Sequence, residues 1–194
     1  MSTPLSLRFV LSAPAVGSLP ASAAEVAVVG RSNVGKSSLI NALANRKALA
    51  QVSKTPGRTR LINLYELDGG ATFVDLPGYG YAAVSGSMRQ GWGRMIEDYL
   101  QTREPLVRIM VLVDGEIGPT KLDVTMLEWL RHHDLPVAVV ATKHDKVKAS
   151  VREKRKTELA AGCGVPRGEV HWVSASKGTG IPELRGHVHA WLSL

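Results

Sequence analysis

The chain has 194 residues, of which 44% are hydrophobic and 21% charged, a composition typical of one globular domain with a buried core. No apolar stretch reaches the roughly 18 residues that a membrane-spanning helix needs, so we expect no transmembrane segment and no membrane insertion. The formal charge of +7 favours polyanionic partners over cationic ones.

The N-terminal segment imitates a signal peptide only loosely. Residues 5–24 hold some apolar residues and an Ala-Ser-Ala sequence, but Pro14, Gly17 and Pro20 interrupt the apolar run. We therefore read residues 1–23 as an N-terminal extension and residues 24–194 as the main domain. The lone Cys163 cannot form an internal disulfide, which agrees with a reducing compartment and a cytoplasmic protein.

Residues 30–37 fit the phosphate-binding pattern GxxxxGK[ST] and lie between an apolar run at 26–29 and a helix expected at about 37–45. A strand that enters a helix through a glycine loop directs backbone N–H groups and the positive helix end at one point. We name residues 30–37 the phosphate loop, and its members are Gly30, Arg31, Ser32, Asn33, Val34, Gly35, Lys36 and Ser37. Lys36 is expected to reach the β and γ phosphates and Ser37 to ligate Mg²⁺. The alternative is an ordinary glycine turn between core elements.

The remaining elements alternate between strands and helices. Strands are expected at 60–67, 71–76, 106–113, 136–141 and 170–173, and helices at 89–102, from Thr120 onward, at 150–161 and at 182–192. Asp68-Gly69-Gly70 reads as a hairpin turn, and Asp123 is placed to complete a capping box with Thr120. This order predicts an α/β, doubly wound, mainly parallel six-stranded sheet with one antiparallel edge strand, helices on both faces, and a ligand beyond the carboxyl ends of the strands.

Three short segments after predicted strands supply the remaining chemistry of a nucleotide site. Asp75-Leu76-Pro77-Gly78 places a carboxylate near the phosphate loop, where Mg²⁺ needs an acidic second shell. In Thr142-Lys143-His144-Asp145, the Asp145 carboxylate can accept two hydrogen bonds from guanine, whereas adenine lacks that donor pair. The stem of Lys143 can cover the base, and the backbone of Ser174, Ala175 and Ser176 can donate to the guanine O6.

Over residues 24–192 the chain resembles the translation-factor-like branch of the Ras-type P-loop GTPases, the TrmE-Era-EngA-EngB-septin group. More narrowly, segments 30–37, 54–60, 75–80 and 142–145 resemble the EngB (YsxC/YihA) family. Three details carry this narrower likeness: Thr142 in place of the usual Asn, the triplet Gly57-Arg58-Thr59, and Tyr79-Gly80-Tyr81. The resemblance implies a Ras-like fold and a bacterial GTPase that acts in assembly of the large ribosomal subunit and is needed for normal cell division and septation.

The resemblance also assigns roles to residues. It implies that Thr59 completes the Mg²⁺ shell beside Ser37, with Thr55 as the competing choice, and that Gly57, Arg58, Thr59, Arg60 and Leu61 belong to the nucleotide site. It gives the catalytic positions to Lys36, Thr59 and Gly78, because the γ-phosphate and Mg²⁺ would hold the loops around Thr59 and Gly78.

Tyr79 stands where a water-orienting Gln is found in Ras-like proteins, and a phenol cannot readily replace that amide. We therefore expect slow hydrolysis of GTP to GDP and phosphate, stimulated by a partner. The resemblance to related GTPases implies that Asn33 holds a K⁺ ion that stabilises the transition state. The alternative is an Asn that only supports the loop, and the sequence favours neither.

Two basic blocks bear on the partner. Residues 31–65 hold seven Lys or Arg and no acid, and residues 146–156 hold six against Glu153 alone. Such blocks fit the large ribosomal subunit or its rRNA, although part of the first block belongs to the phosphate loop and the second can be a solvated helix face. We expect a monomer that does not bind DNA. The alternatives are a P-loop ATPase or kinase, which would not need Asp145, and a GTP-dependent interaction module for division proteins.

Overall fold

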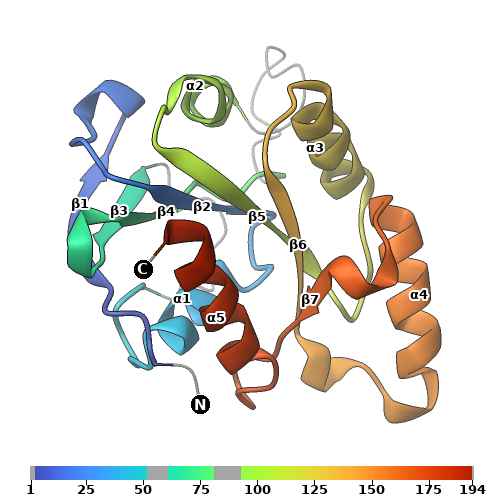
Figure 1. The fold of residues 1–194 in the computed structure, drawn as a ribbon. Coiled ribbons are helices and arrows are strands. Elements are labelled where there is room, and N and C mark those ends of the chain that lie inside the picture. The colour runs from blue at the N-terminus through green and yellow to red at the C-terminus, as the bar shows by residue number, and fades with distance from the viewer. Residues whose placement is uncertain (1–2, 52–60, 81–92, 194) are drawn as a thin grey trace.

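The computed structural model describes residues 3–51, 61–80 and 93–193, which form one sheet with helices on both of its faces (Figure 1). The strands are β1 (Arg8–Ala13), β2 (Glu25–Gly30), β3 (Ile62–Glu66), β4 (Thr72–Asp75), β5 (Leu106–Asp114), β6 (Val137–Thr142) and β7 (Val170–Trp172). The helices are α1 (Lys36–Leu43), α2 (Arg94–Thr102), α3 (Lys121–His132), α4 (Arg152–Cys163) and α5 (Ile181–Leu192). The predicted α/β class with a mainly parallel sheet is confirmed.

The described sheet has seven strands in the order β1-β3-β4-β2-β5-β6-β7, so the predicted count of six is wrong. The additional strand is β1, which pairs antiparallel with β3 from Arg8 opposite Glu66 to Ala13 opposite Ile62. Strand β3 is antiparallel to β4, as the hairpin predicted, but it lies inside the sheet and β1 forms the edge. Most of β1 is exposed and its register shifts at a bulge, so its sequence shows little of the alternation that reveals a strand.

The central strands are buried on both sides because each face of the sheet is covered by helices. Along β2 and β5, alternate residues enter two separate core clusters: Val29 and Val111 pack toward α2, α3 and α4, whereas Val28 and Leu112 pack toward α1 and α5. Leu5 and Leu7 of the N-terminal segment are buried in the second cluster. Residues 8–13 therefore belong to this sheet, and Leu5 and Leu7 pack in the core beside it.

Helix α3 begins as predicted. The Asp123 carboxylate accepts hydrogen bonds from the backbone N–H and the hydroxyl of Thr120, both at 2.8 Å, and completes a capping box. Within the described residues, no helix combines the length and the apolar character that a membrane crossing requires.

The topology brings the motifs to one edge. Strand β2 pairs in parallel with β4 and β5, and β6 in parallel with β5 and β7, so the carboxyl ends of these five strands point the same way. The phosphate loop follows β2, Asp75 ends β4, Thr142 ends β6, and Ser174 follows β7. The candidate site lies along this edge.

Candidate nucleotide-binding site

The phosphate loop is held in shape by its two glycines. A Cβ on Gly30 would lie 2.8 Å from the Cγ1 of Val34 and 3.1 Å from the Cβ of Leu112, so only glycine fits where β2 passes its neighbour. Gly35, directly before α1, has a φ of 108°, which other residues rarely adopt. Asn33, also left-handed with a φ of 65°, is exposed, and Val34 is buried. The loop therefore wraps around the N-terminal end of α1, where its free N–H groups can meet an anion.

Lys36 and Asp75 form the charged centre of this end of the site. Burial lowers the pKa of Lys36, and the charge of Asp75 partly offsets that effect. Burial raises the pKa of the fully enclosed Asp75 carboxyl, opposed by Lys36 and by a hydrogen bond from Asn63. A Cβ on Gly78 would lie 3.1 Å from the Nζ of Lys36, so Gly78 lies directly beside the ammonium group. A polyphosphate would add negative charge beside this half-buried lysine and so favour its charged form.

One oxygen of Asp75 fits a nearby cation. Its Oδ1 is buried and has no hydrogen-bond partner among the described residues. An unpaired, buried carboxylate oxygen is costly unless a charged group or water meets it, so the donor set suits Mg²⁺. Ser37 lies half-buried in the first turn of α1.

Part of the predicted phosphate end can be described and part cannot. Leu76 is buried and its N–H donates to the Val28 carbonyl at 3.1 Å, while Pro77 is half-buried beside it. Leu61 precedes β3 and is 40% exposed. Gly57, Arg58, Thr59, Arg60 and the competing Thr55 lie outside the described residues.

Thr142 connects the two ends of the site. Its hydroxyl donates to the backbone carbonyl of Val34 at 2.7 Å and lies 3.3 Å from the carbonyl of Val113. The next residue, Lys143, has a left-handed backbone, and its Nζ donates to the buried carboxylate of Asp114 at 2.6 Å. This ion pair fixes the lysine stem that the sequence placed over the base. Asp114 was not among the site residues predicted from the sequence. Its place at the carboxyl end of β5, the edge where the site was expected, could have indicated it.

Asp145 is oriented by the loop after β7. The Ser174 hydroxyl donates to its Oδ1 at 2.6 Å, and this bond is the main reason why the pKa of Asp145 lies below its ordinary value. Ser174 also lies 3.2 Å, oxygen to oxygen, from the hydroxyl of Ser176 and accepts a bond from the backbone of Lys177. Ala175 lies half-buried between the two serines.

The backbone joins the same two segments, because the N–H of His144 donates to the Val173 carbonyl at 3.0 Å. The structure thus brings residues 142–145 and 174–176 together around an ionised carboxylate. That carboxylate can accept the paired N–H donors of guanine.

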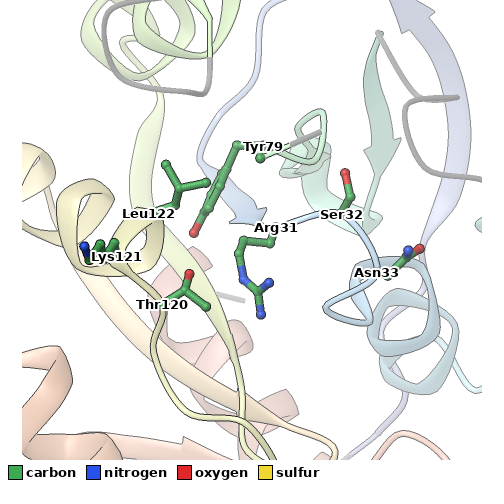
Figure 2. A pocket seen from close by; sticks show the side chains of 8 residues that line it. Arg31, Ser32, Asn33, Tyr79, Thr120, Lys121 and Leu122 are labelled. Carbon is green, nitrogen blue, oxygen red and sulfur yellow. The ribbon is translucent and has the colours of Figure 1, made fainter. Parts of the chain in front are cut away.

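A cavity of about 480 Å³ opens beside the phosphate loop (Figure 2). The side chains around it include those of Arg31, Ser32, Asn33, Tyr79, Thr120 and Lys121. Behind the cavity, the hydroxyl of the buried Tyr79 donates to Asp123 at 2.9 Å, and the Nε of Arg31 lies 3.2 Å from the same carboxylate. The sequence indicated Asp123 only as a helix cap. Its contacts with Arg31 and with Tyr79, which is 44 positions away, form only when the chain folds, so the sequence pattern does not reveal them.

Comparisons by family profile and by sequence both match this chain to GTPases or GTP-binding proteins. The profile of a family described as 50S ribosome-binding GTPase matches residues 25–143. A relative from Pelotomaculum thermopropionicum, described as a probable GTP-binding protein EngB, is 47% identical over 189 residues, which is 96% of each chain.

Two crystal structures resemble the fold closely. A probable GTP-binding protein EngB has 27% identity and a TM-score of 0.66, over 88% of this chain and 99% of that one. A structure of Era with MgGDPNP and nucleotides 1506–1542 of 16S ribosomal RNA has 26% identity and a TM-score of 0.65, over 87% of this chain and 56% of that one.

Proposed function

Since the chain belongs to the EngB family of GTP-binding proteins, we propose that it is a GTP-driven switch that acts in assembly of the large ribosomal subunit and is needed for normal cell division and septation. The name of the matching family refers to the 50S subunit, and the Era structure includes both a GTP analogue and ribosomal RNA. These likenesses support a ribosomal partner for this chain.

The observation that carries the choice of nucleotide is the pairing of Asp145 with Ser174. The bond directs the carboxylate and favours its ionised form, so that guanine would satisfy it, whereas adenine would leave it desolvated without donors. A P-loop ATPase or small-molecule kinase would share Lys36 and Ser37 but would have no use for this arrangement.

The switch itself would work through residues around the γ-phosphate. Lys36 would bind the β and γ phosphates, and Gly78, beside its ammonium group, would move when the γ-phosphate is lost. Ser37 and Thr59 would hold Mg²⁺, with Asp75 in its second shell. When bound, Mg²⁺ would neutralise charge on the phosphate oxygens.

Slow intrinsic hydrolysis is part of the proposal. The Tyr79 hydroxyl is engaged by Asp123, and so the position occupied by a water-orienting Gln in Ras-like proteins offers no free polar group of that kind. A partner would complete the site. The exposed Asn33 is the residue that would hold a stimulating K⁺ ion.

The RNA partner is supported by a basic surface beside the base-binding end. We call it the α4 basic surface, and it comprises Lys146, Lys148, Arg152, Lys154, Arg155 and Lys156. Glu158 forms ion pairs with Lys154 and Arg155 at 3.8 and 3.9 Å, and such exposed pairs are weak. Lys146 and Lys148 are exposed and take part in no ion pair of the described residues. Lys156 is paired with Glu153 at 3.5 Å, so the surface holds six cations against two acids. It therefore presents net positive charge, which suits rRNA phosphates.

The proposal includes a cytoplasmic monomer that neither enters membranes nor binds DNA. The rival function is a GTP-dependent interaction module for division proteins, in which hydrolysis is incidental.

Co-sedimentation with purified large ribosomal subunits in GDP and in a non-hydrolysable GTP analogue, at several salt concentrations, tests the choice between the two functions. We expect binding that depends on the nucleotide and weakens with salt. Absence of binding in both nucleotide states would overturn the ribosomal proposal, and equal binding in both would overturn the switch.

A further inference from the structure

Asp123 joins three parts of the molecule that are far apart in the sequence. It belongs to the first turn of α3, it accepts a hydrogen bond from Tyr79 after β4, and it pairs with Arg31 of the phosphate loop. Helix caps usually lie at the surface, and an aspartate is seldom fully buried unless it is paired. Asp123 has no exposed surface at all. Capping alone does not account for this burial.

The contacts divide between the two oxygens of Asp123. Oδ2 accepts both bonds from Thr120 and lies 3.2 Å from the Nε of Arg31, while Oδ1 accepts the Tyr79 hydroxyl at 2.9 Å. Loss of either partner would leave a buried charge incompletely satisfied, which is costly in a water-free environment. Arg31 and Tyr79 are therefore held to α3 more tightly than packing alone would hold them.

Tyr79 is also bonded to the backbone of the phosphate loop. Its N–H donates to the Gly30 carbonyl at 3.3 Å, and its carbonyl accepts from the N–H of Ser32 at 3.0 Å. Figure 2 shows the Tyr79 and Arg31 side chains next to each other, facing Thr120. The residue before Tyr79 is Gly78, which lies beside Lys36 and Ser32. Any shift of Tyr79 therefore changes the position of Gly78 relative to Lys36.

We propose that Asp123 is a positioning residue of the nucleotide site, which holds Tyr79 and Arg31 so that Gly78 and Lys36 keep the spacing that the γ-phosphate requires. The inference rests on GTP binding and is independent of the ribosomal role. It places a third element, α3, behind the phosphate end of the site. It also gives Tyr79 a function other than orienting water: Tyr79 anchors the segment that follows Asp75.

The structure offers a matched control for testing this inference. Tyr99 is likewise buried, and its hydroxyl likewise donates to a buried carboxylate, that of Glu25. Glu25 is also paired with Arg103, and it begins β2, whereas the phosphate loop follows the other end of that strand. Tyr99 reaches Glu25 from α2, so its hydroxyl lies at the end of β2 remote from the phosphate loop. Tyr79→Phe and Tyr99→Phe each remove one hydroxyl that binds a carboxylate, and both should lower the free energy of unfolding.

The readout is the ratio of two affinities, measured by calorimetry with GDP and with a non-hydrolysable GTP analogue in the presence of Mg²⁺. We expect Tyr79→Phe to weaken binding of the analogue by about three- to tenfold, the usual net effect of one hydrogen bond, and to leave GDP binding unchanged. Tyr99→Phe should change neither affinity. The inference fails if Tyr79→Phe and Tyr99→Phe have the same ratio of affinity for the analogue to affinity for GDP. The contacts of Asp123 with Tyr79 and Arg31 would then serve only the stability of the fold.

Asp123→Asn provides a second reading. The amide oxygen can still accept from Tyr79, but the amide nitrogen cannot accept the two bonds from Thr120, and the charge that attracts Arg31 is lost. We therefore expect a lower free energy of unfolding and, in the folded variant, a selective loss of affinity for the analogue. A folded variant with an unchanged ratio would also overturn the inference. If this variant does not fold, Tyr79→Phe decides the question, because it removes only one oxygen atom.

Discussion

The hydroxyl of Thr142 donates a hydrogen bond of 2.7 Å to the backbone carbonyl of Val34, which joins the segment proposed to bind the base to the phosphate loop. The two residues are 108 positions apart in the sequence, and the threonine is buried. The resemblance to Ras-type GTPases implies an asparagine at this position in most of them, and here the side chain of a threonine reaches the phosphate loop.

Thr142→Val should therefore act on both ends of the site. Valine has nearly the same shape but no donor, so the buried Val34 carbonyl loses a partner, and we expect the free energy of unfolding to fall by about 1–3 kcal/mol. GTP affinity should fall as well, because the loop loses its link to β6. Chemical denaturation and calorimetry measure the two effects. Thr142→Ser, which keeps the hydroxyl, is the control, and equal losses in both variants would show that the bond is unimportant.

Asp145→Asn should change the preference for the base. The asparagine amide replaces one of the two acceptors that guanine uses, so we expect GTP affinity to fall by about ten- to a hundredfold, as for hydrogen bonds to charged groups. Xanthosine triphosphate, which carries an oxygen in place of the guanine amino group, should bind better than it does to the unaltered protein. Competition binding with GTP, ATP and the xanthosine nucleotide measures this.

Asp134→Asn is the matched control for that experiment. Asp134 is exposed in the turn after α3 and has a φ of 52°, a conformation that asparagine adopts easily. It should leave all three affinities unchanged. An Asp145→Asn variant with the original ranking of nucleotides would contradict the assignment of Asp145 to the base.

Ser174 should set the acid limit of guanine binding. Its hydroxyl is the main cause that lowers the pKa of Asp145 below the ordinary value of 3.8. A lowered pKa means that the bond favours the ionised form, so its contribution is present at neutral pH and is lost as the pH falls through the lowered pKa. In Ser174→Ala the pKa should rise, and GTP affinity should decline at a higher pH than in the unaltered chain.

The measurement is GTP affinity between about pH 5.5 and pH 3.5, with circular dichroism at each point to confirm that the chain stays folded. Ser176→Ala is the comparison, because the Ser176 hydroxyl contributes less to the shift. Identical pH profiles for Ser174→Ala and the unaltered protein would contradict the role of Ser174.

The parts of the site that sequence could predict are those carried by local spacing. Gly30, Gly35 and Lys36 form one loop, and Thr120 with Asp123 forms one helix turn, so their patterns contain their own geometry. The alternation of strands and helices likewise sufficed for a mainly parallel sheet.

Contacts between distant segments were beyond prediction from the sequence. The bond from Ser174 to Asp145 spans 29 positions and the bond from Tyr79 to Asp123 spans 44, and each depends on how the strands are ordered in the sheet. Strand β1 was missed for a different reason. An edge strand with mostly exposed residues has no buried face to impose an alternating pattern.

Potassium should stimulate hydrolysis if Asn33 holds the ion. We expect several-fold faster GTP turnover in KCl than in NaCl, since a fixed cation beside the phosphates stabilises developing charge. Asn33→Gly is the informative variant, because the φ of 65° suits glycine and only the amide is removed. Its rates in the two salts should be equal. Equal rates in the unaltered protein would leave Asn33 as a residue that supports the loop.

The α4 basic surface should contribute to binding of the large ribosomal subunit through charge. The double change Lys148→Glu and Lys154→Glu replaces two exposed cations, so we expect weaker co-sedimentation and a salt dependence whose slope falls by about one for each phosphate that the surface no longer neutralises. The matching change Arg46→Glu and Lys47→Glu, in the other basic block, tests whether position matters, since both residues there are exposed as well. GTP affinity, measured in parallel, should stay unchanged in the first double variant. If both double variants weaken binding equally, the attraction is general to the charge of the chain; if neither does, the RNA binds to another surface.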